Sequence, residues 1–186
     1  MRIKVSKIKA VILDIDDTIV SFCKHLLTIH NNLNKVKYSM ADLKEWDLPS
    51  DLNDTFNEYE ELLYASQPII KAARKKIKKL RESGYRIILM TARDVSFRKV
   101  TEFNLALNDI GYDELYFNKN KSLKINRFSK EYEILLFADD KVTTVNKVKR
   151  NTTIPNVFLI GMPSNKDSKI EKGVIRVNDI GGIYVG

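Results

Sequence analysis

The sequence predicts an α/β fold, in which a parallel sheet carries helices on both faces and a small helical segment is inserted after the first strand. Short apolar runs alternate with longer amphipathic stretches along the 186 residues. Strands that alternate with helices favour a parallel sheet covered on both sides. One long stretch after the first apolar run breaks this alternation, and it indicates the insertion.

Six short runs rich in Ile, Leu, Val or aromatic residues are the predicted strands. Three of them, Arg86–Met90, Ile134–Phe137 and Val157–Ile160, show little alternation, as expected for strands buried on both faces. The full set is Ile8–Leu13, Arg86–Met90, Glu114–Phe117, Ile134–Phe137, Val157–Ile160 and Gly173–Val177.

Between these runs, apolar residues recur at the spacing of a helix face. Gly84 and Gly111 follow two of the patterns as C-terminal stops. The three predicted helices are marked by Ala73, Ile77 and Leu80; by Val100, Phe103, Leu107 and Ile110; and by Val142, Val145 and Val148.

The inserted segment contains two further helix-like patterns. They consist of Val20, Cys23, Leu26, His30 and Leu33, and of Phe56, Tyr59, Leu62 and Leu63. Ligands of open α/β sheets bind at the carboxyl ends of the strands, so an insertion at that edge lies over the ligand crevice. We expect residues 1–19 and 67–186 to form the core and residues 20–66 to form a helical cap.

The composition excludes several classes of protein. A single cysteine, Cys23, rules out an internal disulfide and a multi-cysteine zinc site, and two histidines are too few for most His-based metal centres. No apolar stretch approaches the ~18–20 residues of a membrane span. The apolar run Ala10–Leu13 stops at Asp14 without forming a signal peptide. We therefore expect a cytoplasmic protein with no membrane partner.

The formal net charge of +8 is concentrated in lysine-rich runs. Such an excess attracts polyanions, but it does not select among nucleic acid, nucleotides and acidic lipid. Runs such as Lys71–Arg81 are usually solvated helix faces, and this one carries no aromatic residues for stacking against single strands. Nucleic acid therefore stays an open partner, and the oligomeric state is not predicted.

Three carboxylates, Asp14, Asp16 and Asp17, directly follow the first predicted strand. Asp14 and Asp16 have the spacing of residues on one face of a strand. Crowded carboxylates repel one another, and Mg²⁺ relieves that repulsion because it prefers hard oxygen ligands. The alternative is a solvated acidic turn in which Asp17 or Thr18 caps the next helix.

Two other predicted strands end in polar residues. Arg86–Met90 is followed by Thr91, Ala92 and Arg93, where a hydroxyl and backbone N–H groups can bind a phosphate oxygen. Ile134–Phe137 is followed after one residue by Asp139 and Asp140. Either acid can instead act only as a helix N-cap.

Lysines also precede the fourth predicted strand, and one of them can neutralise a phosphoryl group and an aspartate together. Most of the four are expected to be surface residues, and spacing alone does not choose among them. The candidates are Lys119, Lys121, Lys124 and Lys130.

The order Asp-x-Asp-x-Thr, strand–Thr, Lys and strand–Asp-Asp resembles the haloacid dehalogenase (HAD)-like phosphohydrolase superfamily over the whole chain. This resemblance implies a Rossmann-like core. The secondary motifs are similar to those of the 5′(3′)-deoxyribonucleotidase-like branch, which has a small helical cap. They are Ile29–Asn31, Ser39–Leu48, Thr91–Arg93, Met162–Asn165 and Val177–Ile180. Many relatives have glycine where this chain has Asp17.

The resemblance implies a role for each matching residue. Asp14 matches the nucleophile that becomes an aspartyl-phosphate, Asp16 matches the general acid and base, and Thr91 matches the phosphate-binding hydroxyl. The carboxylates of Asp14 and Asp140, with the backbone carbonyl of Asp16, would hold Mg²⁺. Asp139 would pair with the catalytic lysine. That lysine is Lys121 or Lys124, and we prefer Lys121.

The predicted function is Mg²⁺-dependent hydrolysis of a small phosphomonoester, with a nucleoside monophosphate ranked first. Thr91, Ala92 and Arg93 would bind the phosphate, and Phe22 or Trp46 would stack on the base. The alternatives are a phosphatase of polynucleotide ends and a non-catalytic nucleic-acid-binding module. A phospho-receiver domain is disfavoured, because its phospho-acceptor Asp lies on a middle strand and the third predicted strand has no Asp at its end.

Overall fold

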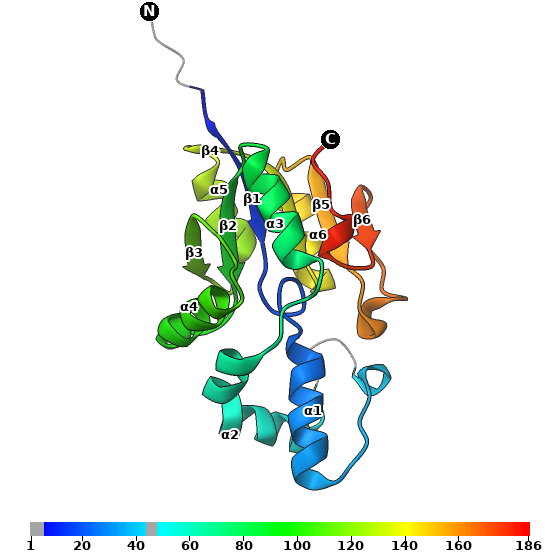
Figure 1. Ribbon diagram of the computed structural model, residues 1–186. Helices are drawn as coiled ribbons and strands as arrows, with labels where there is room; N and C mark the ends of the chain where they lie inside the picture. The colour runs from blue at the N-terminus through cyan, green and yellow to red at the C-terminus, as the bar shows by residue number, and fades with distance from the viewer. Residues whose placement is uncertain (1–5, 44–47) are drawn as a thin grey trace, which may run out of the picture.

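The computed structural model describes residues 6–43 and 48–186. A six-stranded sheet in the order β3-β2-β1-β4-β5-β6 forms its centre, and every strand pair is parallel (Figure 1). The strands are β1 (Ile8–Leu13), β2 (Arg86–Thr91), β3 (Glu114–Phe117), β4 (Tyr132–Asp139), β5 (Asn156–Ile160) and β6 (Val174–Val177). The predicted α/β class is therefore confirmed.

The order of the strands reverses at β1. The chain runs from β1 through β2 to β3 on one side, and then crosses β1 to continue with β4, β5 and β6. Such a reversal opens a crevice beyond the carboxyl ends of the two strands that flank it. Here these strands are β1 and β4.

Helices cover both faces of the sheet. The helices of the described chain are α1 (Phe22–Asn34), α2 (Ser50–Ser66), α3 (Ala73–Glu82), α4 (Arg98–Leu107), α5 (Lys121–Phe128) and α6 (Val142–Asn151), with short 3-10 helices at Met40–Asp42, Val95–Phe97, Pro163–Asn165 and Ile180–Gly182. One core joins α3 and α4 to one face, and a second core joins α5 and α6 to the other. Alternate residues of β1 serve the two cores, because side chains alternate along a strand. Val11 and Leu13 belong to the first, and Ala10 and Ile12 to the second.

The helices α1 and α2 lie side by side beyond the carboxyl edge of the sheet (Figure 1). They share a third apolar cluster with members such as Phe22, Leu26, Leu52 and Leu63. Trp46, together with the rest of 44–47 in the cap motif, lies outside the described residues. The division into residues 20–66 and a core stays a prediction.

The helix α4 exposes two residues that the sequence predicts to be buried. Phe103 is 59% exposed and Leu107 is 68% exposed. The buried face instead carries Thr101, Asn104 and Leu105. The side-chain amide of Asn104 donates to the backbone carbonyls of Ala65 and Gln67, at 3.0 Å each. Polar contacts therefore determine which face of α4 is buried, and the spacing of apolar residues does not reveal them.

Smaller corrections concern the other helices and strands. Leu33 of α1 and Leu62 of α2 are about half exposed, although both belong to predicted apolar patterns. The fourth strand is longer than predicted and includes Asp139. The helix α5 is not among the predicted helices. It forms within a lysine-rich stretch and buries Ile125 and Phe128.

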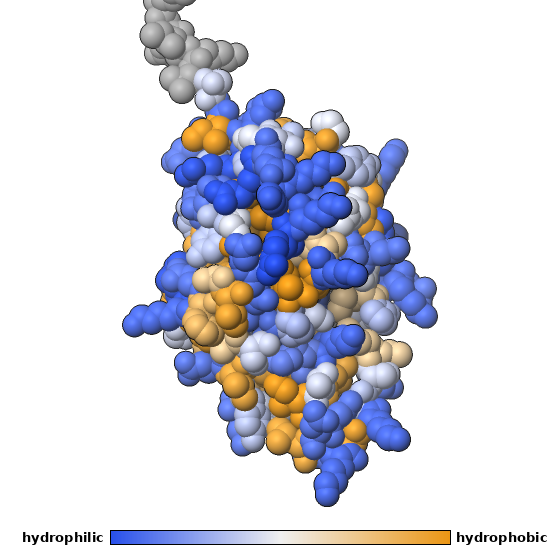
Figure 2. Space-filling view, viewed as in Figure 1, coloured by the Kyte–Doolittle hydropathy of each residue, from blue (hydrophilic) through white to orange (hydrophobic). Residues whose placement is uncertain are grey.

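The exposed face of α3 carries much of the positive charge. Figure 2 shows hydrophilic side chains gathered over this helix. Its exposed residues include Arg74, Lys75, Lys78, Lys79 and Arg81. Ala73, Ile77 and Leu80 are buried beneath, as predicted. Of the helices in 6–43 and 48–186, none is long and apolar enough to cross a membrane.

The contrast between Phe137 and Phe103 predicts a large difference in stability between two Phe→Ala variants. Phe137 is fully buried between the sheet and its helices. We expect Phe137→Ala to lower the free energy of unfolding by about 3–5 kcal/mol. Phe103→Ala should change it by about 0.5 kcal/mol or less, since that ring is largely in solvent. Urea unfolding measures both, and equal losses would contradict the placement of α4.

Candidate active site

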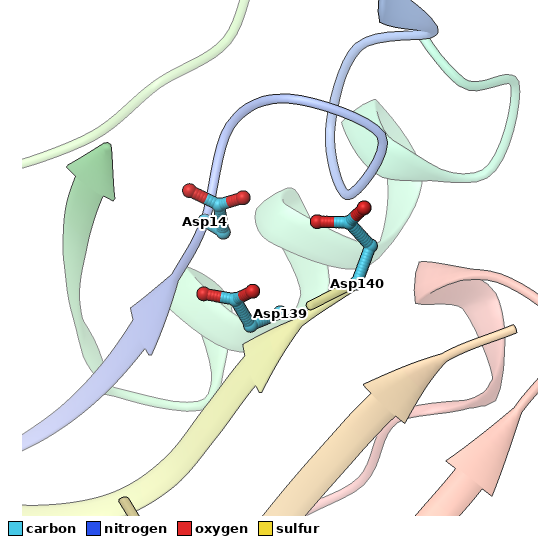
Figure 3. Close-up of side chains that lie close together, drawn as sticks. All are labelled: Asp14, Asp139 and Asp140. Atoms are coloured by element: carbon cyan, nitrogen blue, oxygen red, sulfur yellow. The ribbon is translucent and has the colours of Figure 1, made fainter. Parts of the chain in front are cut away.

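Three carboxylates meet where β1 and β4 end. Asp14 follows the last residue of β1, and its N–H donates to the carbonyl of Ala138 in β4 at 2.9 Å. Asp139 is the last residue of β4, and Asp140 follows it. Figure 3 shows the three side chains converging from the two neighbouring strands. Oxygen atoms of all three lie within 4.8 Å of one another.

These acids carry more negative charge than their protein partners neutralise. Asp14, Asp139 and Asp140 are all buried, and burial raises the pKa of Asp14 to about 7 and that of Asp140 well above its usual value. The ammonium of Lys121 contacts Asp14 and lies 2.7 Å from Asp139. Burial alone would lower the pKa of Lys121, but the two carboxylates raise it, so this lysine stays charged. One cation among three carboxylates leaves room for another.

The hydrogen bonds decide which acids suit a metal ion. One oxygen of Asp139 accepts from Lys121 and the other from the backbone N–H of Lys141, at 2.9 Å. Among the described residues, none donates to the carboxylate of Asp140. A hard divalent cation fits this oxygen-rich site. Asp14 and Asp140 are therefore the candidate side-chain ligands, whereas Asp139 is held by the lysine.

The side chain of Asp16 turns away from this cluster. Its two oxygens accept from Nε and Nη2 of Arg93, at 2.9 and 2.6 Å. Arg93 also donates to the hydroxyl of Thr101 at 2.9 Å, and its guanidinium lies 4.0 Å from the ring centre of Tyr64. Asp16 therefore does not join the three-carboxylate group, and only its backbone carbonyl is left as a candidate ligand. The two-point pairing fixes the orientation of its carboxylate.

The residues at the end of β2 and just after it lie beside the acids. Thr91 is fully buried, and its hydroxyl accepts the backbone N–H of Arg93 at 3.2 Å. Ala92 and Arg93 line the same cavity as Asp14 and Asp16. Thr91 is not among the described residues that line it. Three of the five side-chain N–H groups of Arg93 donate to Asp16 and Thr101.

The structure separates the two candidate lysines. Lys121 begins α5 and reaches the acids from its buried side. Lys124 is one turn further on. Its ammonium instead lies 4.7 and 5.1 Å from the ring centres of Tyr116 and Phe128. The geometry thus agrees with the preference for Lys121, although the chemical role of Lys121 stays a prediction.

A cavity of about 370 Å³ opens beside the acids. It is lined by Asp14, Asp16, Phe22, Phe56, Tyr64, Ala92, Arg93, Lys119, Lys121, Asp139, Asp140, Lys141 and Thr144. Three aromatic residues form one wall of the cavity. The ring of Phe22 packs edge to face on Phe56, with the ring centres 5.7 Å apart, and tilted on Tyr64, with the ring centres 5.9 Å apart. Phe22 lines the cavity, and its role in binding stays a prediction.

Sequence reasoning does not single out Tyr64 or Phe56 as site residues. The available signal is their spacing of eight, which places both on one face of a helix. A larger cavity of about 690 Å³ contains none of the predicted site residues. Lys7, Tyr132 and Pro155 are part of its lining, so it lies at the amino ends of the strands, away from the acids.

Asp17 belongs to the acidic turn but not to the carboxylate cluster. Its carboxylate accepts the backbone N–H of Cys23 at 3.1 and 3.2 Å, near the start of α1. The alternative in which Asp17 caps a helix therefore describes this residue correctly. The turn is not solvated, however, because Asp17 is 2% exposed.

Comparison with known proteins gives a family match. Residues 1–158 match the family model described as HAD superfamily, subfamily IIIB (acid phosphatase). No curated protein matches the sequence at a significant level.

Two solved structures with the same fold have low sequence identity to this chain. A haloacid dehalogenase-like hydrolase from Burkholderia xenovorans LB400 is 13% identical, with a TM-score of 0.65 over 95% of this chain and 94% of that one. The HAD-hydrolase YfnB from Bacillus subtilis, solved bound to magnesium, is 13% identical, with a TM-score of 0.60 over 94% and 96%. At these identities the similarity shows the fold alone.

A chain of the Pnkp1/Rnl/Hen1 RNA repair complex is also similar. It is 20% identical, with a TM-score of 0.55, and the match covers 86% of this chain. This chain spans only 44% of the length of that one.

The raised pKa values predict that Mg²⁺ stabilises the protein more at pH 7.5 than at pH 5.5. A carboxyl whose pKa rises from 3.8 to about 7 on folding favours folding at low pH, and this contribution is lost between about pH 4 and 7. Protons must leave before a metal binds, so acid weakens binding. At 100 times its dissociation constant, Mg²⁺ should raise the Tm by roughly 5–10 °C at pH 7.5. We expect less than half of that at pH 5.5.

The matched control for this measurement is a pair of Asp→Asn variants. Asp140→Asn should lose the Tm increase, whereas Asp167→Asn, whose side chain is 88% exposed, should keep it. A Tm increase in Asp140→Asn equal to that of the wild type would contradict this metal site.

Proposed function

This chain belongs to the HAD superfamily, subfamily IIIB, and is a phosphoric monoester hydrolase, and from this premise we propose that it is a Mg²⁺-dependent phosphatase acting through an aspartyl-phosphate on Asp14. The observation that carries the proposal is the buried group of Asp14, Asp139 and Asp140 around Lys121, beside a cavity. Such a group repels a phosphate unless a cation is bound. It suits phosphoryl transfer once one is.

In the proposed first step, a carboxylate oxygen of Asp14 attacks phosphorus and the bond from phosphorus to the ester oxygen breaks. Lys121 holds the other end of Asp14 and offsets charge on the phosphoryl oxygens. Asp139 keeps the lysine in place from the far side. Covalent catalysis divides one difficult displacement into two easier ones.

Asp16 is proposed to move the protons. It gives a proton to the departing ester oxygen, and then removes one from the water that attacks the aspartyl-phosphate. That attack breaks the bond from phosphorus to Asp14, releases inorganic phosphate and restores the free carboxylate. Both oxygens of Asp16 accept from Arg93 in this structure, so the proposed transfers require Asp16 to turn from Arg93 toward the ester oxygen.

A divalent cation would be held by the carboxylates of Asp14 and Asp140 and the backbone carbonyl of Asp16. When bound, Mg²⁺ neutralises developing charge on the phosphoryl oxygens. The proposed phosphate ligands from the protein are Thr91, Ala92 and Arg93.

We propose that residues 20–66 form the cap and that the substrate is a nucleoside monophosphate. The cap's resemblance to the deoxyribonucleotidase-like branch supports this choice, as does the aromatic wall of Phe22, Phe56 and Tyr64 beside the acids. A cavity of about 370 Å³ is within the usual range for small ligands. A location in the cytoplasm also stays a prediction.

A phosphorylated polynucleotide end is the second candidate substrate. Lys119 and Lys141 add positive charge to the cavity lining, and the chain carries a net charge of +8. The similarity to a chain of an RNA repair complex is consistent with it. We rank it second because the insertion beyond the strand ends favours a small substrate.

Two substitutions test the mechanism. Asp14→Asn should abolish turnover, because an amide does not attack phosphorus. Asp16→Asn should slow hydrolysis of a nucleoside monophosphate by roughly 10²–10⁴-fold, the usual contribution of general acid catalysis. An activated aryl phosphate should be affected less, since its leaving oxygen needs no proton. Circular dichroism establishes that both variants fold, and wild-type turnover by Asp14→Asn would refute the covalent mechanism.

A substrate panel tests the ranking. We expect nucleoside monophosphates to have a higher kcat/KM than 3′-phosphorylated oligonucleotides or sugar phosphates. Their hydrolysis should depend only weakly on salt. When a protein neutralises several phosphates of an oligonucleotide, counterions are released, so the binding affinity falls steeply with added salt. A preference for oligonucleotides that weakens in this way would reverse the ranking.

A further inference from the structure

Asp17 occupies a backbone conformation that most residues avoid. Its φ is +51°, in the left-handed region, where glycine is unstrained and Asp and Asn are the usual exceptions. The conformation explains why glycine suits this position. It leaves open why this chain carries a carboxylate that is 2% exposed.

The contacts of Asp17 supply the reason. Its two oxygens accept the backbone N–H of Cys23, and the N–H of Phe22 and the thiol of Cys23 also donate to it. These N–H groups belong to the first turn of α1, and the N–H groups of a first turn have no acceptor within their own helix. The side chain of Ser21, the N-cap residue, makes no capping bond, and the first turn contains no other acid. Asp17 therefore takes the place of a local cap, from a position six residues before Cys23.

This bond joins two parts of the site. Asp17 lies in the turn that carries Asp14 and Asp16. Phe22 is the first residue of α1, and its aromatic ring lines the cavity. The ring of Phe22 in turn packs against Phe56 and Tyr64 of α2. The carboxylate thus fixes the aromatic wall relative to the acids.

On the basis of the function proposed above, we infer that Asp17 is a positioning residue that sets selectivity for phosphomonoesters whose leaving group carries a ring. It holds the first turn of α1, and through it Phe22, at a set distance from the phosphoryl site. A small alkyl phosphate that does not reach the aromatic wall should be insensitive to this bond.

The test compares Asp17→Gly with Asp17→Asn at saturating Mg²⁺. Glycine keeps the left-handed backbone and removes the acceptor, whereas asparagine tolerates that backbone and keeps one acceptor oxygen. We expect Asp17→Gly to raise the KM for a nucleoside monophosphate roughly 10-fold, the size of a lost helix cap. Its kcat, and its kcat/KM for glycerol phosphate, should stay close to wild type. Asp17→Asn should restore most of the KM.

Hydrogen exchange gives a readout that does not depend on activity. The amides of Phe22 and Cys23 should exchange faster in Asp17→Gly than in the wild type or in Asp17→Asn. This measurement holds even if the wild type proves inactive on nucleotides, so failure of the inference and failure of the proposed function are distinguishable. Unchanged exchange in the glycine variant would overturn the inference. So would an equal loss of kcat/KM on both substrates, or an asparagine variant as impaired as the glycine variant.

Discussion

The rest of the site depends on the repulsion among buried carboxylates at the end of β1 and β4. A parallel sheet whose order reverses at β1 brings Asp14 against Asp139 and Asp140, with one ammonium among them. Burial removes the water that would otherwise screen these charges, so the pKa of Asp14 rises to about 7. In the proposed function, this uncompensated charge would be offset by a hard cation, which would in turn bind a phosphoryl group.

A further set of contacts holds Asp16, the proposed proton-transfer residue. Arg93 pairs with Asp16 through two N–H groups and lies against the ring of Tyr64, whose hydroxyl donates to Glu60 at 3.1 Å. Both Tyr64 and Glu60 belong to α2, within the inserted segment. The acidic turn is therefore connected to α2 indirectly, through Arg93, and to α1 directly, through the bond from Cys23 to Asp17.

Sequence patterns predict the sheet well because strands that are buried on both faces appear as continuous apolar runs. The carboxyl ends of parallel strands also lie at one edge of the sheet, so residues that follow these runs are expected to meet there. They predict helix orientation less well. Phe103 and Leu107 fit an apolar pattern but face solvent, because Thr101 and Asn104 turn α4 through polar contacts. Lys121 and Lys124 differ by one turn, and only the packing shows which ammonium faces the acids.

The most direct test of the central claim is a search for the covalent intermediate. Asp16→Asn should accumulate an aspartyl-phosphate, because the water of the second step lacks its base. Peptide mass spectrometry of this variant, quenched in acid during turnover of an activated aryl phosphate, should find one phosphoryl group on the peptide that contains Asp14. Turnover with no phosphorylated peptide, or with the phosphoryl group on another residue, would contradict the account.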